Sequence, residues 1–367
     1  MTLRELGWDE ATAGHFARFA SVARVQPARV AVEFNHIYRV LSAPAPDDGA
    51  DVQAEEVEAV AAGRLKHQAT SRSQLPAVGD WVAVRLEPDG RRGRIVAVLP
   101  RRSQFSRKAA GEVTDQQVVA ANVDLVFIVM ALDADFSLRR LERYLLLARE
   151  SGAQPVVLLT KPDLCEDVVS RVADVTAVCA GSPVHVINPL SGEGTETVRG
   201  YLPPGSTGAL LGSSGVGKST IINRLIGADV RKTRAVREAD SKGRHTTTHR
   251  ELVALPGAGL VIDTPGMREL QLWEATDAVR GTFDDIEALA GGCHFADCRH
   301  DNEPRCAVKD AAARGVLAAG RLDSYRKLQE ELVFLARQQD ERALIESKRR
   351  ARVQGKAIKQ YLKSKHR

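Results

Sequence analysis

The chain has 367 residues, of which 44% are hydrophobic and 27% are charged, and its formal net charge is +5. These are ordinary values for a globular protein, and the length predicts two or three domains. The longest nearly apolar run, at 123–132, is much shorter than the ~20 residues that span a bilayer, and no secretory signal opens the chain. Five cysteines, an odd number, argue against a disulfide framework in a chain of this size. We therefore expect a cytoplasmic protein with no membrane partner.

The positive charge is concentrated at the C-terminus. The last 21 residues hold nine Lys or Arg and no acid, so the rest of the chain has a net charge of −4. A basic tail on a mildly acidic body favours a polyanionic partner, with RNA as the first candidate. The alternative is a solvated tail that only improves solubility.

The N-terminal third of the chain predicts an arm and a small barrel. Residues 1–29 form the expected arm, with one short amphipathic helix at 10–19. Over 30–110, short apolar runs separated by turn signals predict an RNA-binding OB-fold barrel. The expected strands are 28–34, 37–43, 61–67, 80–87 and 93–100.

Two charged segments accompany these strands. The acidic segment at 43–59 has six acids and no base, and we expect it to be a disordered insertion. The segment at 85–108 has eight Lys or Arg against two acids. Because this barrel is poor in aromatic residues, we expect contacts to the RNA backbone more than base stacking.

From residue 111 to 281 the pattern changes to apolar strands that alternate with helices. This alternation predicts a parallel α/β sheet with ligands at the carboxyl ends of its strands. One helix is expected to stop at Gly152 and another at Gly227. The expected strands are 125–132, 154–160, 183–188, 208–212, 251–255 and 260–264.

The segment GSSGVGKST matches the phosphate-loop pattern. It follows an apolar strand and opens a helix, which is the context that such a loop requires. Lys218 is expected to reach the β- and γ-phosphates, and Ser219 to ligate magnesium. The nucleotide-binding residues predicted here are Gly212, Ser213, Ser214, Gly215, Val216, Gly217, Lys218, Ser219 and Thr220.

A second buried strand runs into DTPG. Asp263 is expected to act on magnesium, and the Gly266 N–H on the γ-phosphate. Between the two motifs, the polar segment KGRHTTTHRE offers the threonines at 246–248, one of which is expected to close over magnesium. We assign Thr247.

Two segments that typically read guanine, TKPD and NPLSGEG, precede the phosphate loop instead of following it. A parallel sheet tolerates such a rearrangement if a link joins the old chain ends. The segment PPGSTG at 203–208 is expected to be that link, and to be flexible. The predicted base-reading residues are Thr160, Lys161, Asp163, Asn188, Pro189 and Leu190.

With its motifs in this order, the chain resembles the circularly permuted GTPases of the RsgA (YjeQ) family, which act on the small ribosomal subunit. The resemblance covers nearly the whole chain and implies three parts: an OB-like barrel, a permuted GTPase domain, and a zinc-binding domain with a basic helical tail at 282–367. It implies a GTP hydrolase that the small subunit stimulates and that serves late maturation or quality control of that subunit. Its implied partners are that subunit and its ribosomal RNA, and its cofactor is magnesium with GTP. We expect a monomer.

The chain departs from the family at two base-reading positions. The resemblance implies Asn where Thr160 stands and Ser-Ala where Asn188-Pro189 stands. Proline has no N–H to donate to guanine O6, so Leu190 N–H is a possible substitute. Asp163 still accepts from guanine N1 and N2. We therefore expect a somewhat relaxed guanine specificity.

The residue after DTPG is Met267, where Ras-like GTPases place the glutamine that orients water. The resemblance assigns that role to His245 in the segment GRHTTT. Without the resemblance, the simpler interpretation is that His245 is a solvent-exposed histidine with no role in catalysis.

Three of the five cysteines fall in CHFADCRHDNEPRC. Three thiolates and one imidazole form the ligand set of a structural zinc site, and the resembled family has its zinc site here. His294 is a competing ligand. The assigned zinc ligands are Cys293, Cys298, His300 and Cys306.

Two other functions remain as alternatives to a GTPase. An ATP-using phosphate-loop enzyme is compatible with the altered base readers. An RNA-binding assembly scaffold with a vestigial nucleotide pocket is the other, and the intact Lys218, Ser219 and Asp263 oppose it.

Overall fold

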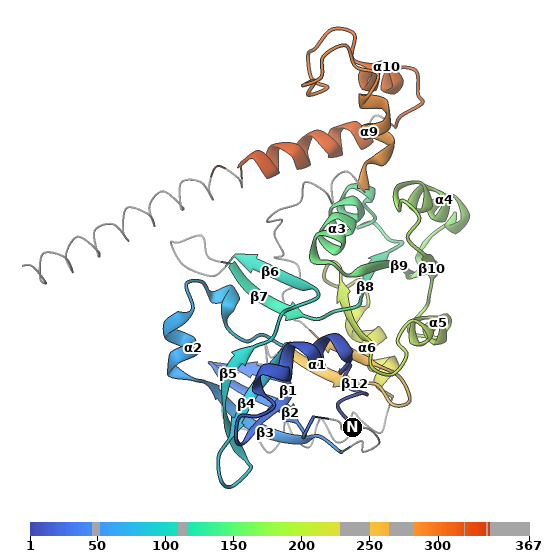
Figure 1. Cartoon of the computed structure of the whole chain (residues 1–367). Helices are drawn as coiled ribbons and strands as arrows, with labels where there is room; N and C mark the ends of the chain where they lie inside the picture. The colour runs from blue at the N-terminus through green and yellow to red at the C-terminus, as the bar shows by residue number, and fades with distance from the viewer. Residues whose placement is uncertain are drawn as a thin grey trace, which may run out of the picture. The chain divides into compact units, whose positions relative to one another are not determined.

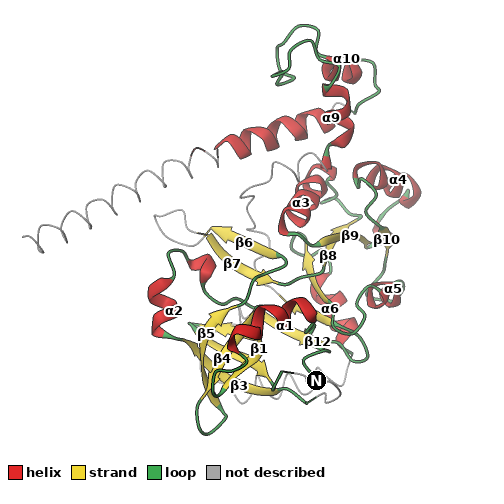
Figure 2. Cartoon of the chain, viewed as in Figure 1, coloured by secondary structure: helices red, strands yellow, loops and turns green. Residues whose placement is uncertain are grey.

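The computed structural model describes residues 1–45, 52–108, 116–227, 250–263, 282–318, 320–334 and 337. Among them the chain forms two compact units, one that runs to Asp284 and one that begins at Asp285 (Figures 1 and 2). The first unit holds both the barrel and the nucleotide-binding sheet. The basic tail at 347–367 lies outside the described residues, and the predicted domain boundaries remain predictions.

The barrel has OB-fold topology. Its strands are β1 (Val25–Phe34), β2 (Ile37–Ser42), β3 (Glu55–Ala61), β4 (Trp81–Leu86) and β5 (Arg92–Val98). They follow the order β1-β2-β3-β5-β4, and β4 pairs with β1 to close the barrel. The interior is filled by alternate apolar side chains, which are Ala28, Val30, Tyr38, Val40, Val57, Ala59, Ala61, Val82, Val84 and Ile95.

The third strand is not where the sequence predicted it. It lies at 55–61 and begins within the acidic segment at 43–59 that we expected to be disordered. The predicted strand at 61–67 is instead largely a helix, α2 (Gly63–Gln68). The reason is the alternation in EEVEAVA: Val57 and Ala59 are buried while Glu58 between them is exposed. A period of two with one apolar face is enough for a barrel strand, whatever the charge on the other face.

The predicted N-terminal helix is present as α1 (Glu10–Phe16), continued by a 3-10 turn, η1 (Ala17–Phe19). Asp9 caps it, since its Oδ1 accepts from Thr12 N at 2.8 Å. The preceding Trp8 packs edge-on against Trp81 of the barrel, with ring centroids 5.0 Å apart. A second 3-10 turn, η2 (Arg72–Gln74), and a hairpin of β6 (Gln104–Lys108) and β7 (Gln116–Ala121) complete this part.

The nucleotide-binding sheet is built from the six predicted strands. They are β8 (Leu125–Ala131), β9 (Gln154–Thr160), β10 (Val184–Val186), β11 (Thr207–Leu211), β12 (Arg250–Ala254) and β13 (Leu260–Asp263). The order is β10-β9-β8-β11-β13-β12, and the first five are parallel. Only β12 is antiparallel, because the five residues between β12 and β13 are too few for the crossover that parallel neighbours need.

Among the described residues, four helices belong to this sheet: α3 (Leu138–Ser151), α4 (Val168–Val178), α5 (Thr195–Gly200) and α6 (Lys218–Ile226), with a 3-10 turn, η3 (Pro162–Leu164). As predicted, α3 stops at Gly152, which is left-handed at φ +87°, and α6 stops at Gly227. The core between sheet and helices is apolar and includes Phe127, Leu158, Ile221 and Leu225, all at most 1% exposed.

The barrel and the nucleotide-binding sheet are one continuous sheet. β12 pairs antiparallel with β1, which gives eleven hydrogen-bonded strands. Arg250 at the start of β12 lies opposite Glu33, with 3.9 Å between Nη1 and Oε2. β12 therefore has barrel on one side and nucleotide-binding strands on the other.

The buried guanidinium of Arg29 strengthens this junction. Its side chain is fully buried and donates to the carbonyls of Leu6, Gly79 and Asn122 and to Thr207 Oγ1. Burial lowers the pKa of Arg29 to about 10, so it is still charged at neutral pH. One side chain thus ties the arm, the barrel, the end of β7 and β11 together.

The second unit contains α9 (Asp284–Ala290), α10 (Ala307–Ala313) and a helical segment at 320–334. Arg321 donates to both carboxylate oxygens of Asp285, and Tyr325 Oη donates to Glu287 at 3.0 Å. These bonds hold the last described helix against α9.

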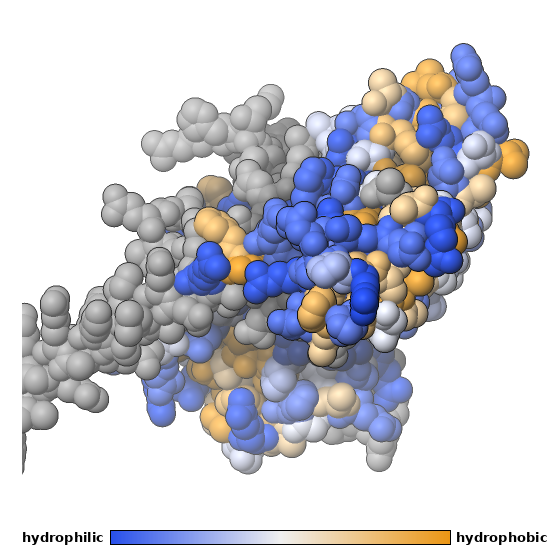
Figure 3. Space-filling view, turned by 90° about the horizontal axis from the view of Figure 1, so that it is seen from above, coloured by the Kyte–Doolittle hydropathy of each residue, from blue (hydrophilic) through white to orange (hydrophobic). Residues whose placement is uncertain are grey.

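Figure 3 shows the hydropathy of one face of the molecule. On the face shown in Figure 3, hydrophilic side chains predominate among the described residues and apolar ones are scattered between them. Within the ranges that the structure describes, no helix has the length and apolar composition needed to cross a membrane.

Candidate functional site

The predicted phosphate loop connects β11 to α6. A Cβ on Gly212 would lie 2.3 Å from the Val129 carbonyl oxygen, so only glycine fits there. Gly217, which precedes α6, has φ +101°, a conformation that side chains rarely adopt. Glycine is therefore required at 212 because the Val129 carbonyl oxygen approaches closely, and at 217 because of the backbone conformation.

Lys218 is the first residue of α6 and turns back over the loop. Its Nζ donates to the carbonyl of Gly212 at 2.7 Å and to that of Ser213. Ser219 and Thr220 follow in the first turn, where backbone N–H groups have no partner within the helix. An ammonium and free N–H groups at a helix N-terminus form a site for phosphate.

The first base-reading loop leaves the end of β9. Thr160 is fully buried, and its Oγ1 donates to the Val216 carbonyl in the phosphate loop at 2.7 Å. Lys161 has left-handed φ +57°, and Asp163 lies in the following turn η3. The hydroxyl at 160 therefore braces one nucleotide loop against the other.

The second base-reading loop, after β10, is held by Asn188. Its Nδ2 donates to Asp163 Oδ1 at 3.3 Å, and its Oδ1 accepts from Leu190 N at 3.1 Å and Ser191 N at 3.4 Å. Leu190 N–H, suggested above as the donor to guanine O6, is thus already bonded within its own loop. Asn188 instead orients Asp163.

These loops meet. A Cβ placed on Gly217 would lie 3.7 Å from Pro189 Cγ and 3.9 Å from Thr160 Cγ2. The strand register explains why these loops lie close together. Ala131 of β8 lies opposite Thr160 at the end of β9, and Leu211 at the end of β11 lies opposite Ile128 of β8. Carboxyl ends of parallel strands share one edge of a sheet, and all the described base and phosphate loops leave from that edge.

Asp263 ends β13 at the same edge. The remaining predicted residues, Gly266, Thr247 and His245, lie outside the described residues.

The loop that follows β8 carries polar residues that were not predicted from the sequence. Asp133 Oδ2 accepts from Lys161 Nζ at 2.8 Å, and Asp135 pairs with Arg140 of α3, which donates to Ser213 Oγ at 2.9 Å. The only signal available was the position of two acids directly after a buried strand.

The four predicted zinc ligands come together in the second unit. Their ligand atoms all lie within 4.8 Å of one another. Cys293 Sγ lies 3.8 Å from Cys306 Sγ and 3.6 Å from His300 Nδ1, and His300 Nδ1 lies 3.4 Å from Cys306 Sγ. A tetrahedral Zn²⁺ would separate two sulfurs by about 3.8 Å and a sulfur from a nitrogen by about 3.5 Å. The cluster has the geometry of a structural metal site.

His300 is the histidine of this cluster, and the competing His294 instead packs against Phe295, with ring centroids 4.8 Å apart. Burial lowers the pKa of His300, which favours the neutral imidazole that a metal requires. His300 also has φ +60°, and Arg326 donates to its carbonyl.

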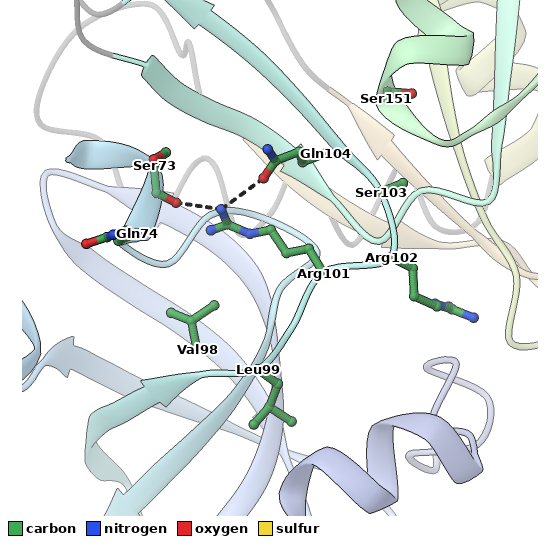
Figure 4. Close-up of a pocket in the computed structure, with 9 residues that line it drawn as sticks. All are labelled: Ser73, Gln74, Val98, Leu99, Arg101, Arg102, Ser103, Gln104 and Ser151. Carbon is green, nitrogen blue, oxygen red and sulfur yellow. Dashed lines mark hydrogen bonds between the residues drawn. The ribbon is translucent and has the colours of Figure 1, made fainter. Parts of the chain in front are cut away.

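An open pocket of about 530 Å³ lies away from the nucleotide loops, between η2, the start of β6 and the end of α3 (Figure 4). Arg101 crosses it and is bonded to the buried Asp80 at 2.7 Å. Arg102 pairs with Asp9 at 3.0 Å and Asp124 at 3.3 Å. Arg92 and Arg94 also pair with acids of the chain, so at least four of the eight basic residues predicted to contact RNA have a carboxylate partner within the chain.

Comparison with known proteins distinguishes between the functional hypotheses that the sequence leaves open. A sequence model of the RsgA GTPase family matches residues 98–273. The Small ribosomal subunit biogenesis GTPase RsgA of Opitutus terrae is 50% identical over 349 residues, which cover 93% of this chain and 92% of that protein. The protein of the same name from Syntrophotalea carbinolica is 40% identical over 358 residues and covers 95% of each chain. The chain belongs to the RsgA GTPase family.

Solved structures agree. YjeQ from Thermotoga maritima has a TM-score of 0.61 and 25% identity, covering 84% of this chain and 99% of that one. YloQ, a circularly permuted GTPase, has a TM-score of 0.58 and 25% identity, covering 85% and 96%. The resemblance stated from the motifs is thus confirmed, and the chain is a GTP hydrolase with a permuted GTPase fold.

The joint of the permutation differs from expectation in one respect. Ser206 N donates to the Pro203 carbonyl at 3.0 Å, and Thr207 already begins β11. The predicted link therefore forms a turn that Ser206 closes on the Pro203 carbonyl, and it enters β11 where Arg29 donates to Thr207 Oγ1.

Proposed function

We propose that this GTPase acts in biogenesis of the small ribosomal subunit and couples GTP hydrolysis to its late maturation or quality control. The observation that carries the proposal is the meeting of the base loops and the phosphate loop at one sheet edge, in a chain half identical to a protein named for that process. The barrel and the basic tail would contact ribosomal RNA, with GTP and magnesium as the cofactor, and the protein would act as a monomer.

Cosedimentation tests this proposal directly. We expect the protein to pellet with purified small subunits in the presence of a non-hydrolysable GTP analogue and to be released with GDP. Multiple-turnover GTP hydrolysis should rise on adding small subunits but not large ones. Binding that ignores the nucleotide, together with unstimulated turnover, would favour a scaffold with a vestigial pocket.

Magnesium would be held by Ser219 and Thr247, with Asp263 acting on it from the end of β13 and the Gly266 N–H on the γ-phosphate. Lys218 would neutralise the phosphates. The support is the position of Ser219 in the first turn of α6 and of Asp263 at the same sheet edge.

Guanine recognition would rest mainly on Asp163. Thr160 Oγ1 is committed to Val216, Pro189 has no N–H, and Leu190 N–H is bonded to Asn188, which leaves the carboxylate as the principal reader. Competition of guanine and adenine nucleotides for binding separates this proposal from an ATP-using enzyme.

Replacing Pro189 by Ala should tighten guanine binding. The new N–H would restore a donor to O6 worth ~1 kcal/mol, about a fivefold gain for GDP and little change for ADP. Isothermal titration with both nucleotides measures it, with Pro183→Ala outside these loops as the matched control. An unchanged GDP-to-ADP affinity ratio would show that another group already occupies that role.

Zinc would fill the cluster of three cysteines and one histidine and would stabilise the fold of the second unit. A closed four-ligand set leaves no position for substrate, so its role is structural.

Removing one zinc ligand should unfold the second unit while sparing the first. Cys298→Ser is expected to lose the bound zinc and the amide-exchange protection of α10, because metal binding contributes much of the folding free energy of so small a unit. Metal analysis and hydrogen exchange measure both, with Cys165→Ser in the first unit as control. Protection of α10 that persists without metal would contradict the assignment.

A further inference from the structure

Residues in and just after the loop that follows β8 contact both the base-reading loop after β9 and the phosphate loop. Asp133 holds Lys161 of the base-reading loop, and Asp135 holds Arg140, whose guanidinium reaches Ser213 of the phosphate loop. We propose that Asp133 and Arg140 are positioning residues for the nucleotide, the first for the base and the second for the phosphates. The inference rests on the proposed function as a GTPase.

Asp133 uses both carboxylate oxygens. Oδ1 accepts from Asp135 N at 2.9 Å, which fixes its own loop, and Oδ2 accepts from Lys161 Nζ at 2.8 Å. The bond to Lys161 is the main cause that holds the pKa of Asp133 below its ordinary value, so the pair is ionic at neutral pH. Lys161 has a left-handed backbone that is unfavourable for lysine, and the ion pair anchors its side chain at the point where the base loop leaves β9.

Arg140 reaches the phosphate loop from the first turn of α3. Its Nη1 donates to the Asp135 carbonyl at 3.2 Å and to Ser213 Oγ at 2.9 Å, and it pairs with the Asp135 carboxylate. On the other side, Lys218 donates to the Ser213 carbonyl. Ser213 is therefore held both by its hydroxyl and by its carbonyl.

These bonds are expected to act on binding more than on stability. Asp135 and Arg140 are partly exposed, and exposed pairs contribute little to folding. A glycine-rich loop loses much conformational freedom when it binds phosphate, so holding it in place beforehand lowers the cost of binding.

The first experiment concerns the base. Asp133→Asn keeps the acceptor for Asp135 but removes the charge that holds Lys161. We expect fluorescent GDP to dissociate about tenfold faster, while the affinity for inorganic tripolyphosphate, which has no base, stays unchanged. The control is Asp174→Asn, which removes the exposed carboxylate paired with Arg171 on α4.

The second experiment concerns the phosphates. Arg140→Gln should weaken GDP and tripolyphosphate by the same factor, about fivefold to tenfold, because the phosphate loop serves both. Arg140→Lys should recover part of the loss. The control is Arg139→Gln at the neighbouring exposed position.

Double-mutant cycles separate positioning from a general structural effect. Asp133→Asn should add nothing in a Lys161→Met background, and Arg140→Gln nothing in a Ser213→Ala background, with melting temperatures near the wild-type value throughout. Additive effects, or variants that bind as the controls do, would overturn the inference. If the wild-type protein failed to bind GDP, the proposed function itself would fail instead.

Discussion

Lys218→Ala is expected to abolish GTP turnover. The Lys218 ammonium is the only side-chain cation that the described phosphate loop contains, and it lies over the loop carbonyls of Gly212 and Ser213. Removing a preorganised charge from a reacting phosphate typically costs about a hundredfold to a thousandfold in rate. Single-turnover hydrolysis of GTP with small subunits present measures the loss.

The control deletes the same kind of side chain elsewhere. Lys66→Ala removes an exposed ammonium from α2 of the barrel and should leave the rate unchanged. Because Lys218 also donates to loop carbonyls, the fold of the variant is checked by its zinc content and melting temperature. Hydrolysis near the wild-type rate in a folded Lys218→Ala protein would refute the phosphate site.

His245→Ala is expected to lose the subunit-stimulated rate while nucleotide and ribosome binding stay intact. A thioether follows DTPG in this chain, at Met267, and it cannot orient the attacking water as a glutamine does. We propose that the small subunit places His245 on that water. A positioned histidine typically contributes about a hundredfold or more, so the slow basal rate should hardly change and stimulation should fall by at least that factor.

The readout is the ratio of the rates with and without small subunits. His67→Ala, at an exposed position on α2, is the matched histidine control, and His245→Gln should keep part of the stimulation because an amide can still orient water. Equal stimulation of wild type and His245→Ala would exclude this histidine from the chemistry.

The continuous sheet gives the barrel a direct route to the nucleotide site. β12 pairs with β1 on one side and with β13 on the other, and Arg250 at its start follows Thr247 by three residues in the chain. The ion pair of Arg250 with Glu33 is largely shielded from solvent, which makes it less sensitive to salt than a surface pair. The barrel and the nucleotide-binding strands are therefore joined directly through β12, the strand that follows the proposed magnesium threonine in the chain.

The features of this protein that depend on contiguous residues can be predicted from its sequence alone. The phosphate loop, the helix stops at Gly152 and Gly227, and the order of motifs that marks the permutation could all be read without a structure, because each follows from local backbone chemistry. The ligand set at 293–306 belongs here as well, since three thiolates and one imidazole within one short loop can meet without a long-range fold.

The features that depend on residues far apart in the sequence become visible only in the folded chain. The acidic residues of EEVEAVA favoured disorder over a strand, and only its pairing with β2 and β5 shows that this segment forms the third barrel strand. The same holds for Arg29, whose bonds reach from Leu6 to Thr207, and for Thr160, whose hydroxyl bonds 56 residues along the chain at Val216. Periodicity records which side of an element is apolar, but a hydrogen bond between distant loops leaves no local pattern. Asp133 and Arg140 therefore became visible only when β8, β9 and β11 brought their carboxyl ends to one edge.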